Sequence, residues 1–161
     1  MHNKVWAATG HRPQKIPNYK YPRLIKLCQA FLRKYQPSLL VVGGALGWDM
    51  AMANACLLEN VEYDTHVPFV GQESKWSSDE QKQYNYLCSR SRKIILVSDG
   101  PYHPDKFKLR NISMVDSSDS VVALLSGPQQ SGTLHCVNYA ESLNKPVINL
   151  WNSWIKYGVV V

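Results

Sequence analysis

Short apolar runs alternate along the chain with longer segments in which apolar side chains recur at helical spacing. The apolar runs predict strands over 4–9, 39–42, 63–68, 93–97, 120–125 and 146–150. The helical segments predict helices over 23–35, 48–59, 78–89, 105–117 and 134–143. Because strands and helices alternate throughout, the sequence predicts an α/β protein with one mainly parallel sheet and helices on both of its faces.

Local signals refine the ends of these elements. Pro13, Pro17 and Pro22 predict an irregular segment between the first strand and the first helix. Ser78, followed by Gln81 three residues later, is typical of a helix start that is capped by its serine. No linker or internal repeat interrupts the pattern, and we therefore expect residues 1–161 to form a single domain.

Glycine-containing turns follow two of the predicted strands, and each turn leads directly into a helix. Gly43, Gly44 and Gly47 follow the second strand, and Gly132 follows the fifth. Glycine lets the backbone come close to a ligand, and the unpaired N–H groups of a helix start favour phosphate. The first turn matches neither the dinucleotide-binding pattern G-x-G-x-x-G nor a P-loop. The alternative interpretation of this first turn is a tight strand-to-helix connection that binds no ligand.

Four predicted loops, over 10–13, 43–49, 69–76 and 126–133, follow the carboxyl ends of strands. In a doubly wound sheet these ends lie along one edge, where ligands bind. We therefore expect a binding site built from these loops, from the end of the first strand and from the helix after the fourth strand. Its expected residues are Thr9, Gly10, His11, Arg12, Gly43, Gly44, Ala45, Gly47, Asp49, Phe69, Gln72, Trp76, Arg110, Asn111, Ser126, Gly127, Ser131, Gly132 and Thr133.

The side chains of this expected site suit a nucleotide. Arg12 and Arg110 are candidates for charge-assisted hydrogen bonds to phosphate. Asp49 is expected either to cap the helix that it begins or to accept hydrogen bonds from ribose hydroxyls. Phe69 or Trp76 is a candidate for stacking on a base, and packing in the core is the alternative for both.

The net charge of +6 is unevenly placed, since no acidic residue precedes Asp49. This distribution favours an anionic partner, either a phosphate-bearing small molecule or nucleic acid, and a solvated basic helix face is the alternative. No apolar run is long enough to span a membrane, and we expect no membrane partner. The segment from Met1 to Trp6 lacks the apolar region of a signal peptide, which predicts a cytoplasmic protein.

Metal binding and catalysis find little support in the sequence. Cys28, Cys56, Cys88 and Cys136 are widely spaced and show no C-x-x-C pattern, which favours reduced thiols over zinc ligands. We expect no metal and no cofactor. The chain lacks a Ser-His-Asp order and paired carboxylates at a useful spacing. His135 and Cys136 are neighbours on a predicted helix and therefore do not face each other.

Five ordered motifs carry a resemblance to a known superfamily. They are T-G-H-R-P at 9–13, G-G-A-L-G-W-D at 43–49, V-P-F-x-G-Q-E-S-x-W at 67–76, R-N-x-x-M-V-D-x-S-D at 110–119 and S-G-T at 131–133. Together they resemble the SLOG superfamily, the Rossmann-like group that joins Lonely-Guy enzymes and DNA-processing protein A. Within it, the chain is most similar to the small stand-alone YspA/YpsA-like proteins of bacteria and their phages.

The resemblance implies a Rossmann-like domain that binds a nucleotide-derived small molecule, for sensing or sequestration in stress or phage–host conflict. Lonely-Guy enzymes cleave nucleoside monophosphates and carry P-G-G-x-G-T-x-x-E in the second turn. Gly132 and Thr133 match this pattern, whereas Cys136 stands at the position of the glutamate. We therefore expect a non-catalytic binder of an ADP-ribose-type or cyclic nucleotide signal.

Two other functions stay open at this point. The first is a phosphoribohydrolase of the Lonely-Guy type in which Asp49 or Glu73 replaces the missing glutamate. The second is a single-stranded nucleic-acid-binding protein, which the relation to DNA-processing protein A and the basic segment 12–21 suggest. Steep salt dependence of binding to a polynucleotide distinguishes the second from a small-molecule binder.

The last predicted feature is an apolar chain end over 151–161. Exposed apolar segments of this kind tend to be interfaces, and we therefore expect a homo-oligomer. The alternative is that the segment packs on its own sheet.

Overall fold

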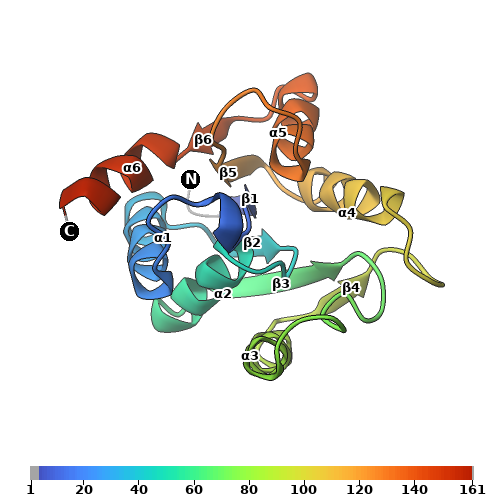
Figure 1. The fold of residues 1–161 in the computed structure, drawn as a ribbon. Coiled ribbons are helices and arrows are strands. Elements are labelled where there is room, and N and C mark those ends of the chain that lie inside the picture. Colours follow the sequence, from blue (N-terminus) through green and yellow to red (C-terminus); the bar gives the residue numbers. More distant parts are fainter. Residues whose placement is uncertain (1–3, 161) are drawn as a thin grey trace.

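The computed structural model describes residues 4–160, and its side chains are described through residue 156. Within these residues, six parallel strands form one sheet in the order β4-β3-β2-β1-β5-β6 (Figure 1). The strands are β1 (Val5–Gly10), β2 (Leu39–Val42), β3 (Glu62–Val67), β4 (Ile94–Leu96), β5 (Ser120–Leu124) and β6 (Val147–Asn149). The central strand β1 pairs with β2 on one side and with β5 on the other, so the chain changes direction across the sheet between β1 and β5.

Helices cover both faces of this sheet (Figure 1). One face carries α1 (Tyr21–Tyr35), α2 (Trp48–Leu58), α3 (Ser78–Ser89) and α6 (Trp151–Val160), whose buried side chains join one core cluster. The other face carries α4 (Asp105–Asp116) and α5 (Gly132–Ser142), which pack over a second cluster. A short 3₁₀ turn, η1 (Pro13–Lys15), follows β1.

The alternation of side chains along the strands explains the two clusters. In β1, Trp6 and Ala8 belong to the α1–α2 side, and Ala7 between them belongs to the α4–α5 side. All three are buried, as in a parallel sheet that is covered on both faces. The predicted α/β class with a parallel sheet and helices on both faces is thus confirmed.

Helices α1 and α5 each begin two residues before the predicted position, and the cap of α3 differs from the prediction. Helix α1 begins at Tyr21, because Pro22 is tolerated in the first turn of a helix, where its missing N–H group has no partner to lose. Helix α3 is capped by Ser77 and not by Ser78. The Ser77 hydroxyl accepts from the Glu80 N–H group, and the Glu80 carboxylate accepts from the Ser77 N–H group at 2.9 Å. The capping signal was therefore predicted one residue too late.

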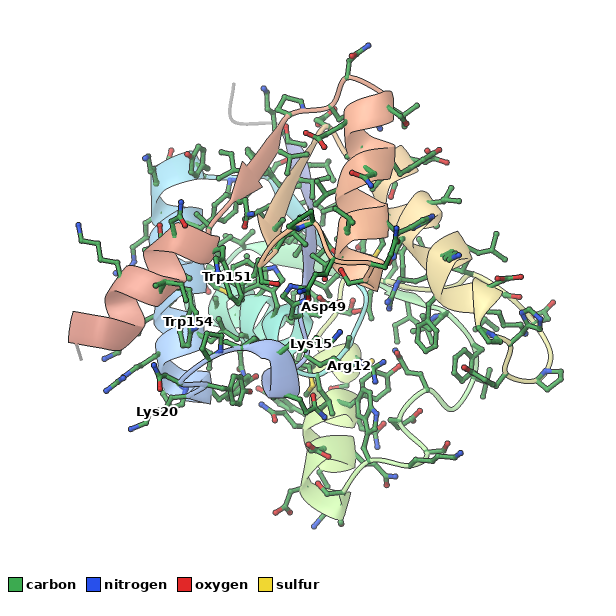
Figure 2. All side chains as sticks on the ribbon, turned by 45° about the horizontal axis from the view of Figure 1, so that its top comes forward. Arg12, Lys15, Lys20, Asp49, Trp151 and Trp154 are labelled. Atoms are coloured by element: carbon green, nitrogen blue, oxygen red, sulfur yellow. The ribbon has the colours of Figure 1, made fainter. Side chains whose placement is uncertain are left out.

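The apolar chain end forms helix α6, for which the sequence pattern predicted no element. Trp154 is fully buried, and its indole N–H group donates to the Pro17 carbonyl at 2.9 Å. Trp151 contacts the His11 ring edge-on at 5.8 Å between ring centroids. Figure 2 shows both tryptophans directed from α6 toward the rest of the molecule. As far as Lys156, the segment packs on its own sheet; Tyr157 to Val161 lie outside the described side chains.

Two other expectations concern the whole chain. The thiols of Cys28, Cys56, Cys88 and Cys136 are free, as expected for reduced residues, and all but that of Cys88 are buried. Among the described residues, no helix combines the length and the apolar character that crossing a membrane requires.

Candidate functional site

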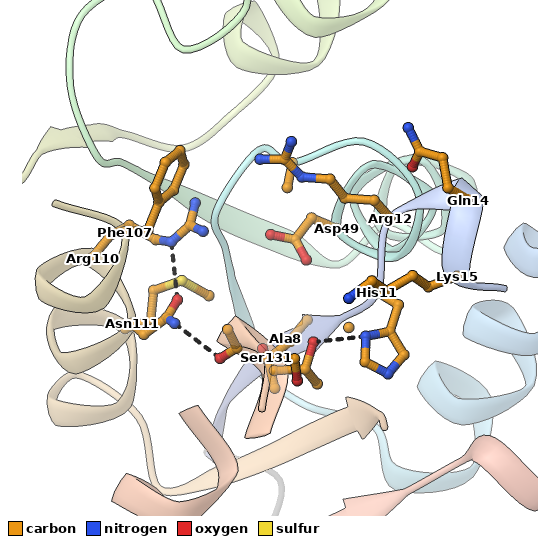
Figure 3. Close-up of a pocket in the computed structure, with 16 residues that line it drawn as sticks. Ala8, His11, Arg12, Gln14, Lys15, Asp49, Phe107, Arg110, Asn111 and Ser131 are labelled. Atoms are coloured by element: carbon orange, nitrogen blue, oxygen red, sulfur yellow. Dashed lines mark hydrogen bonds between the residues drawn. The ribbon is translucent and has the colours of Figure 1, made fainter. Parts of the chain in front are cut away.

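A cavity of about 470 Å³ lies at the carboxyl ends of β1 and β5, where the strand order reverses (Figure 3). Four segments line it: the end of β1 with the η1 turn, the loop before α2, one face of α4 and the start of α5. Its lining residues are Ala8, Thr9, Gly10, His11, Arg12, Gln14, Lys15, Ala45, Asp49, Phe107, Arg110, Asn111, Met114, Ser131, Gly132 and Thr133.

The structure brings eleven of the expected site residues together around this cavity: Thr9, Gly10, His11, Arg12, Ala45, Asp49, Arg110, Asn111, Ser131, Gly132 and Thr133. The other expected residues do not line it: Gly43, Gly44, Gly47, Phe69, Gln72, Trp76, Ser126 and Gly127. Sequence reasoning missed Phe107 and Met114, although their spacing from Arg110 and Asn111 places all four on one face of α4. Ala8, Gln14 and Lys15 were missed as well.

Gly43 is enclosed by protein and is not open to a ligand. Its N–H group donates to Asp49 Oδ2 at 3.0 Å. Its carbonyl accepts from Arg110 Nη1 at 2.7 Å and from Gln72 Nε2 at 3.1 Å. A Cβ atom on Gly43 would lie 2.4 Å from Arg110 Nη1. The expectation that this N–H group binds a ligand is therefore wrong, because Asp49 already occupies it.

The other two glycines of this loop also serve close packing within the protein. Gly44 has φ of +74°, and a Cβ atom there would lie 2.9 Å from the Tyr84 ring. Gly47 has φ of +89°, and a Cβ atom there would lie 2.8 Å from the His11 carbonyl oxygen. Both conformations favour glycine irrespective of a ligand. The first glycine turn is thus explained by the tight strand-to-helix connection alone.

The start of α2 is likewise used within the protein. The Trp48 N–H group donates to the His11 carbonyl at 3.5 Å, and the Met50 N–H group donates to the Ala45 carbonyl at 3.2 Å. The Asp49 carboxylate bonds the loop at Gly43 and also lines the cavity. Of the two helix starts that were expected to be open to a ligand, only that of α5 therefore remains.

The start of α5 forms one wall of the cavity. Ser131 caps the helix by accepting from the Leu134 N–H group at 3.1 Å. Asn111 holds the turn from α4, since its Nδ2 donates to the Gly132 carbonyl at 3.1 Å. The N–H groups of Gly132 and Thr133 belong to the first turn, where a helix offers no acceptor. A Cβ atom on Gly132 would meet only Asn111 Nδ2, at 3.9 Å, so this end of α5 is open.

His11 connects the three chain segments that meet at the strand reversal. Its Nε2 accepts from the Ser126 N–H group at 3.0 Å, and its Nδ1 lies 3.4 Å from Thr133 Oγ1. Because a backbone N–H group can only donate, Nε2 must be unprotonated, and the neutral ring carries its proton on Nδ1. That proton points to Thr133 Oγ1, which leaves the Thr133 hydroxyl free to donate. Burial, and secondly the charge of Lys15, lowers the pKa of His11 and favours this neutral form.

The charges of the site divide into a buried group and a rim. Arg110 is buried, and burial lowers its pKa while the Asp49 carboxylate opposes that shift. Burial raises the pKa of Asp49, and Arg110 with the Gly43 N–H group opposes the rise. At the rim, Arg12 and Lys15 are exposed. Figures 2 and 3 show both close to Asp49 around the mouth of the cavity. Since Asp49 balances Arg110, the rim carries the excess positive charge.

The aromatic side chains that were expected to stack on a base pack elsewhere. Phe69 is buried against Tyr102 and Phe107, and Trp76 packs edge-on against Tyr84. The core alternative therefore holds for both. Phe107 is the aromatic residue that lines the cavity. The Arg12 and Arg110 guanidinium carbons each lie 5.8 Å from its ring centroid.

Acid–base groups beyond Asp49 are poorly placed. Burial raises the pKa of Cys136 to about 11, so this thiol stays protonated near neutral pH. Glu73 does not line the cavity. Among residues 4–160, no group of three or more His, Cys, Asp or Glu side chains has the arrangement of a metal site. Arg12, Lys15, the Thr133 hydroxyl and the open start of α5 are thus among the donors that the cavity offers.

Comparison with known proteins places these observations in a family. The model of the YspA SLOG family matches residues 9–146. An uncharacterized SPβ prophage-derived protein, YoqJ of Bacillus subtilis (strain 168), is 29% identical over 138 residues, which are 74% of this chain and 78% of YoqJ.

Solved structures share the fold. DNA processing protein A from Streptococcus pneumoniae superimposes with a TM-score of 0.63 at 19% identity, over 90% of this chain and 49% of that protein. The same protein from Helicobacter pylori, described with a single-stranded DNA binding mode, gives a TM-score of 0.62 at 18% identity, over 89% and 64% of the two chains. This chain thus spans about half to two thirds of these proteins.

A third solved structure is the molybdenum cofactor binding protein from Rippkaea orientalis, with a TM-score of 0.59 at 20% identity, over 91% of this chain and 76% of that one. These likenesses support the fold alone. The family model covers the motifs around the cavity, from Thr9 through Thr133, in one continuous match. This chain belongs to the YspA SLOG family.

Proposed function

We propose that this chain binds a phosphate-bearing, nucleotide-derived small molecule in the cavity at the strand reversal and releases it unchanged. The observation that carries the proposal is the open start of α5 beside two exposed cations. The first-turn N–H groups of Gly132 and Thr133 lack intrahelical acceptors, and the partial positive charge of a helix start favours an anion there. Arg12 and Lys15 add full charges at the rim.

Proteins of the same fold support a ligand of nucleotide character. DNA processing protein A from Helicobacter pylori binds single-stranded DNA, and the protein from Rippkaea orientalis binds the molybdenum cofactor. Both ligands carry phosphate groups, which suits the donors of this cavity. The specific ligands that we propose are ADP-ribose-type and cyclic nucleotide signals.

The lack of a suitably placed acid supports binding without catalysis. The glutamate of the Lonely-Guy pattern is replaced by Cys136, whose thiol stays protonated near neutral pH. Asp49 lines the cavity and is the acid on which the hydrolase alternative depends. However, its Oδ2 is engaged by the Gly43 N–H group, and burial disfavours its ionised form.

A thermal-shift panel of AMP, cyclic AMP, cyclic dinucleotides, ADP-ribose and cyclic ADP-ribose tests the proposal. A ligand that binds only the folded state stabilises it by mass action, and at least one compound is expected to raise Tm. Chromatography of that compound after incubation with the protein is expected to return it intact. If no compound of the panel raises Tm, the binding proposal is overturned. Multiple-turnover conversion of a compound would replace it with the hydrolase alternative.

The second candidate function is binding of single-stranded nucleic acid, which the structural likeness to DNA processing protein A from Helicobacter pylori favours. The exposed cations Arg12, Lys15 and Lys20 lie on one segment of the chain. Binding of an oligonucleotide that weakens steeply with salt would support this candidate. A response to mononucleotides with little dependence on strand length would support the first.

We place the proposed activity in the cytoplasm and in phage–host conflict, where the protein would sense or sequester the signal. The relative YoqJ is prophage-derived, which supports the phage setting. The free thiols are compatible with a reducing compartment.

We also propose that the chain forms a homo-oligomer, through β4 and not through α6. Strand β4 is the last in the sheet, with Ile94 and Leu96 exposed by 53% and 42%. The Lys93 carbonyl and the Val97 N–H group bond to β3, so the backbone groups of Ile94 and Leu96 face outward. Antiparallel pairing of two copies about Ile95 would place Ile94 against Leu96 of the second copy. It would also bring Lys93 diagonally toward Asp99 of the second copy.

Light scattering at micromolar concentration tests this assembly. The unchanged protein is expected to have at least twice the monomer mass, and Ile94→Lys is expected to reduce it to one copy. Leu58→Lys, which changes an exposed apolar residue at the end of α2, is the matched control and should leave the mass unchanged. A monomer mass for the unchanged protein contradicts the assembly.

A further inference from the structure

Phe107 stands at the one part of the cavity that offers a flat apolar surface. The other apolar lining residues are Ala8, Ala45 and Met114, and the rest of the lining is polar or glycine. Neighbouring aromatic rings pack against the Phe107 ring. Phe69 packs on it edge-on at 5.6 Å between centroids, and Tyr102 lies 6.2 Å away. This support fixes the ring in place, so it can serve as a stacking platform.

Arg12 lies over this ring and has room to move. Its guanidinium carbon is 5.8 Å from the ring centroid, and the side chain is exposed at the rim. A flat heteroaromatic ring that entered here would stack on Phe107, and it would meet the Arg12 guanidinium with its other face or its edge. Arginine and aromatic side chains both stack favourably on bases.

The position of Phe107 along α4 also fits the length of a nucleotide. Asn111, one helical turn further along α4, bonds the Gly132 carbonyl at the start of α5. The four positions from Phe107 to Asn111 correspond to a rise of about 6 Å along the helix. A ribose therefore has room between a base on Phe107 and a phosphate at the first turn of α5. In Figure 3, Asn111 lies between Phe107 and Ser131 along one side of the lining.

We propose that Phe107 is the base-stacking residue of the cavity and that it makes the site selective for nucleotides over sugar phosphates. This inference rests on the proposed function and adds an orientation to it: the base lies under Arg12 on α4, and the phosphate lies at the start of α5. Neither Phe69 nor Trp76 takes part in this contact.

Titration calorimetry with AMP and with ribose 5-phosphate, which lacks the base, tests the inference. The unchanged protein is expected to bind AMP more tightly than ribose 5-phosphate. Phe107→Leu is expected to weaken the affinity for AMP about 5- to 150-fold, which is the range for loss of one base–aromatic stack. The affinity for ribose 5-phosphate is expected to stay unchanged. Phe107→Trp, which keeps a stacking face, is expected to retain AMP affinity.

Tyr86→Leu is the matched control, since it removes an exposed aromatic ring of α3 that does not line the cavity. It is expected to leave both affinities unchanged. The stacking role is overturned if the unchanged protein binds the two compounds with equal affinity, or if Phe107→Leu loses the same affinity for both. In either case the proposal that the cavity binds a ligand is unaffected. If the unchanged protein binds neither compound, this inference fails, whereas the proposed function is overturned only if no compound of the wider nucleotide panel binds.

Discussion

The Asp49 carboxylate accepts a hydrogen bond from the N–H group of Gly43 at 3.0 Å, and both residues are buried. The acid thus closes the glycine loop on itself and neutralises the charge of Arg110, which bonds the Gly43 carbonyl from the other side. This arrangement separates the residues that hold the site together from those that are open to a ligand. Each class predicts a different response to substitution.

Gly43→Ala is expected to destabilise the fold. The added Cβ atom would lie 2.4 Å from Arg110 Nη1 and 2.8 Å from Asp49 Oδ2, which forces both side chains to move. Overpacking of this kind costs about 1–3 kcal/mol. Urea unfolding measures the loss, with Gly127→Ala as control because a Cβ atom on Gly127 meets nothing within 4 Å. Equal stabilities of the two variants would contradict the close packing at Gly43.

Arg110→Ala is expected to lower the free energy of unfolding by about 3–5 kcal/mol, because it leaves the buried Asp49 carboxylate without its counter-charge. Adding Asp49→Asn to this variant is expected to restore part of the loss. Chemical denaturation of the single and double variants gives the two values. A single variant as stable as the unchanged protein would mean that Arg110 does not balance Asp49.

Arg12→Ala is expected to weaken ligand binding by about 1.5–3 kcal/mol with little change in stability, since Arg12 is exposed and free to bond phosphate. Calorimetry with the best ligand of the nucleotide panel measures the effect. Lys20→Ala is the control, because Lys20 is an exposed cation of the same segment that does not line the cavity. Similar losses in both variants would indicate a general charge effect and not a contact by Arg12.

Gly132→Asp is expected to abolish binding and to leave the fold intact. The position is open, and a carboxylate in the first turn of α5 is favourable for the helix by about 0.3–1 kcal/mol. The same carboxylate would occupy and repel the phosphate position. Gly127→Asp places an equal charge in the loop before α5, outside the cavity, and is expected to bind normally. If Gly132→Asp still binds the ligand, the start of α5 does not belong to the binding site.

The free energy of unfolding is expected to fall as the pH drops below about 6.5. Burial lowers the pKa values of His11, His66 and His135 in the folded protein from a usual value of 6.5. Below that pH the unfolded chain takes up protons that the folded chain does not, so stability is full above pH 6.5 and is lost on acidification. His11→Gln is expected to reduce the slope between pH 7 and pH 5, measured by urea unfolding. An unchanged slope would show that His11 does not titrate differently in the two states.

The spacing of apolar residues was sufficient to predict the α/β class, the parallel sheet and the approximate elements. Periodicity records which side of a strand or helix faces the core, and this information is local. The edge of the sheet at which the cavity lies was predicted as well, since parallel strands present their carboxyl ends together. Helix α6 escaped prediction because its apolar side chains were interpreted as an exposed chain end, whereas Trp154 packs on the Pro17 segment.

The sequence by itself therefore determined the fold class and the cluster of Thr9 to Arg12, Asp49 and Ser131 to Thr133 around one edge. Only the tertiary structure decided which glycine turn is open, which aromatic ring faces the cavity and which arginine is free. These outcomes depend on contacts between residues far apart in the chain. Arg110 bonds Gly43 across 67 positions, and His11 accepts from Ser126 across 115. A local pattern cannot show such contacts, because a hydrogen-bonding group that is already paired has the same sequence signature as one that is open.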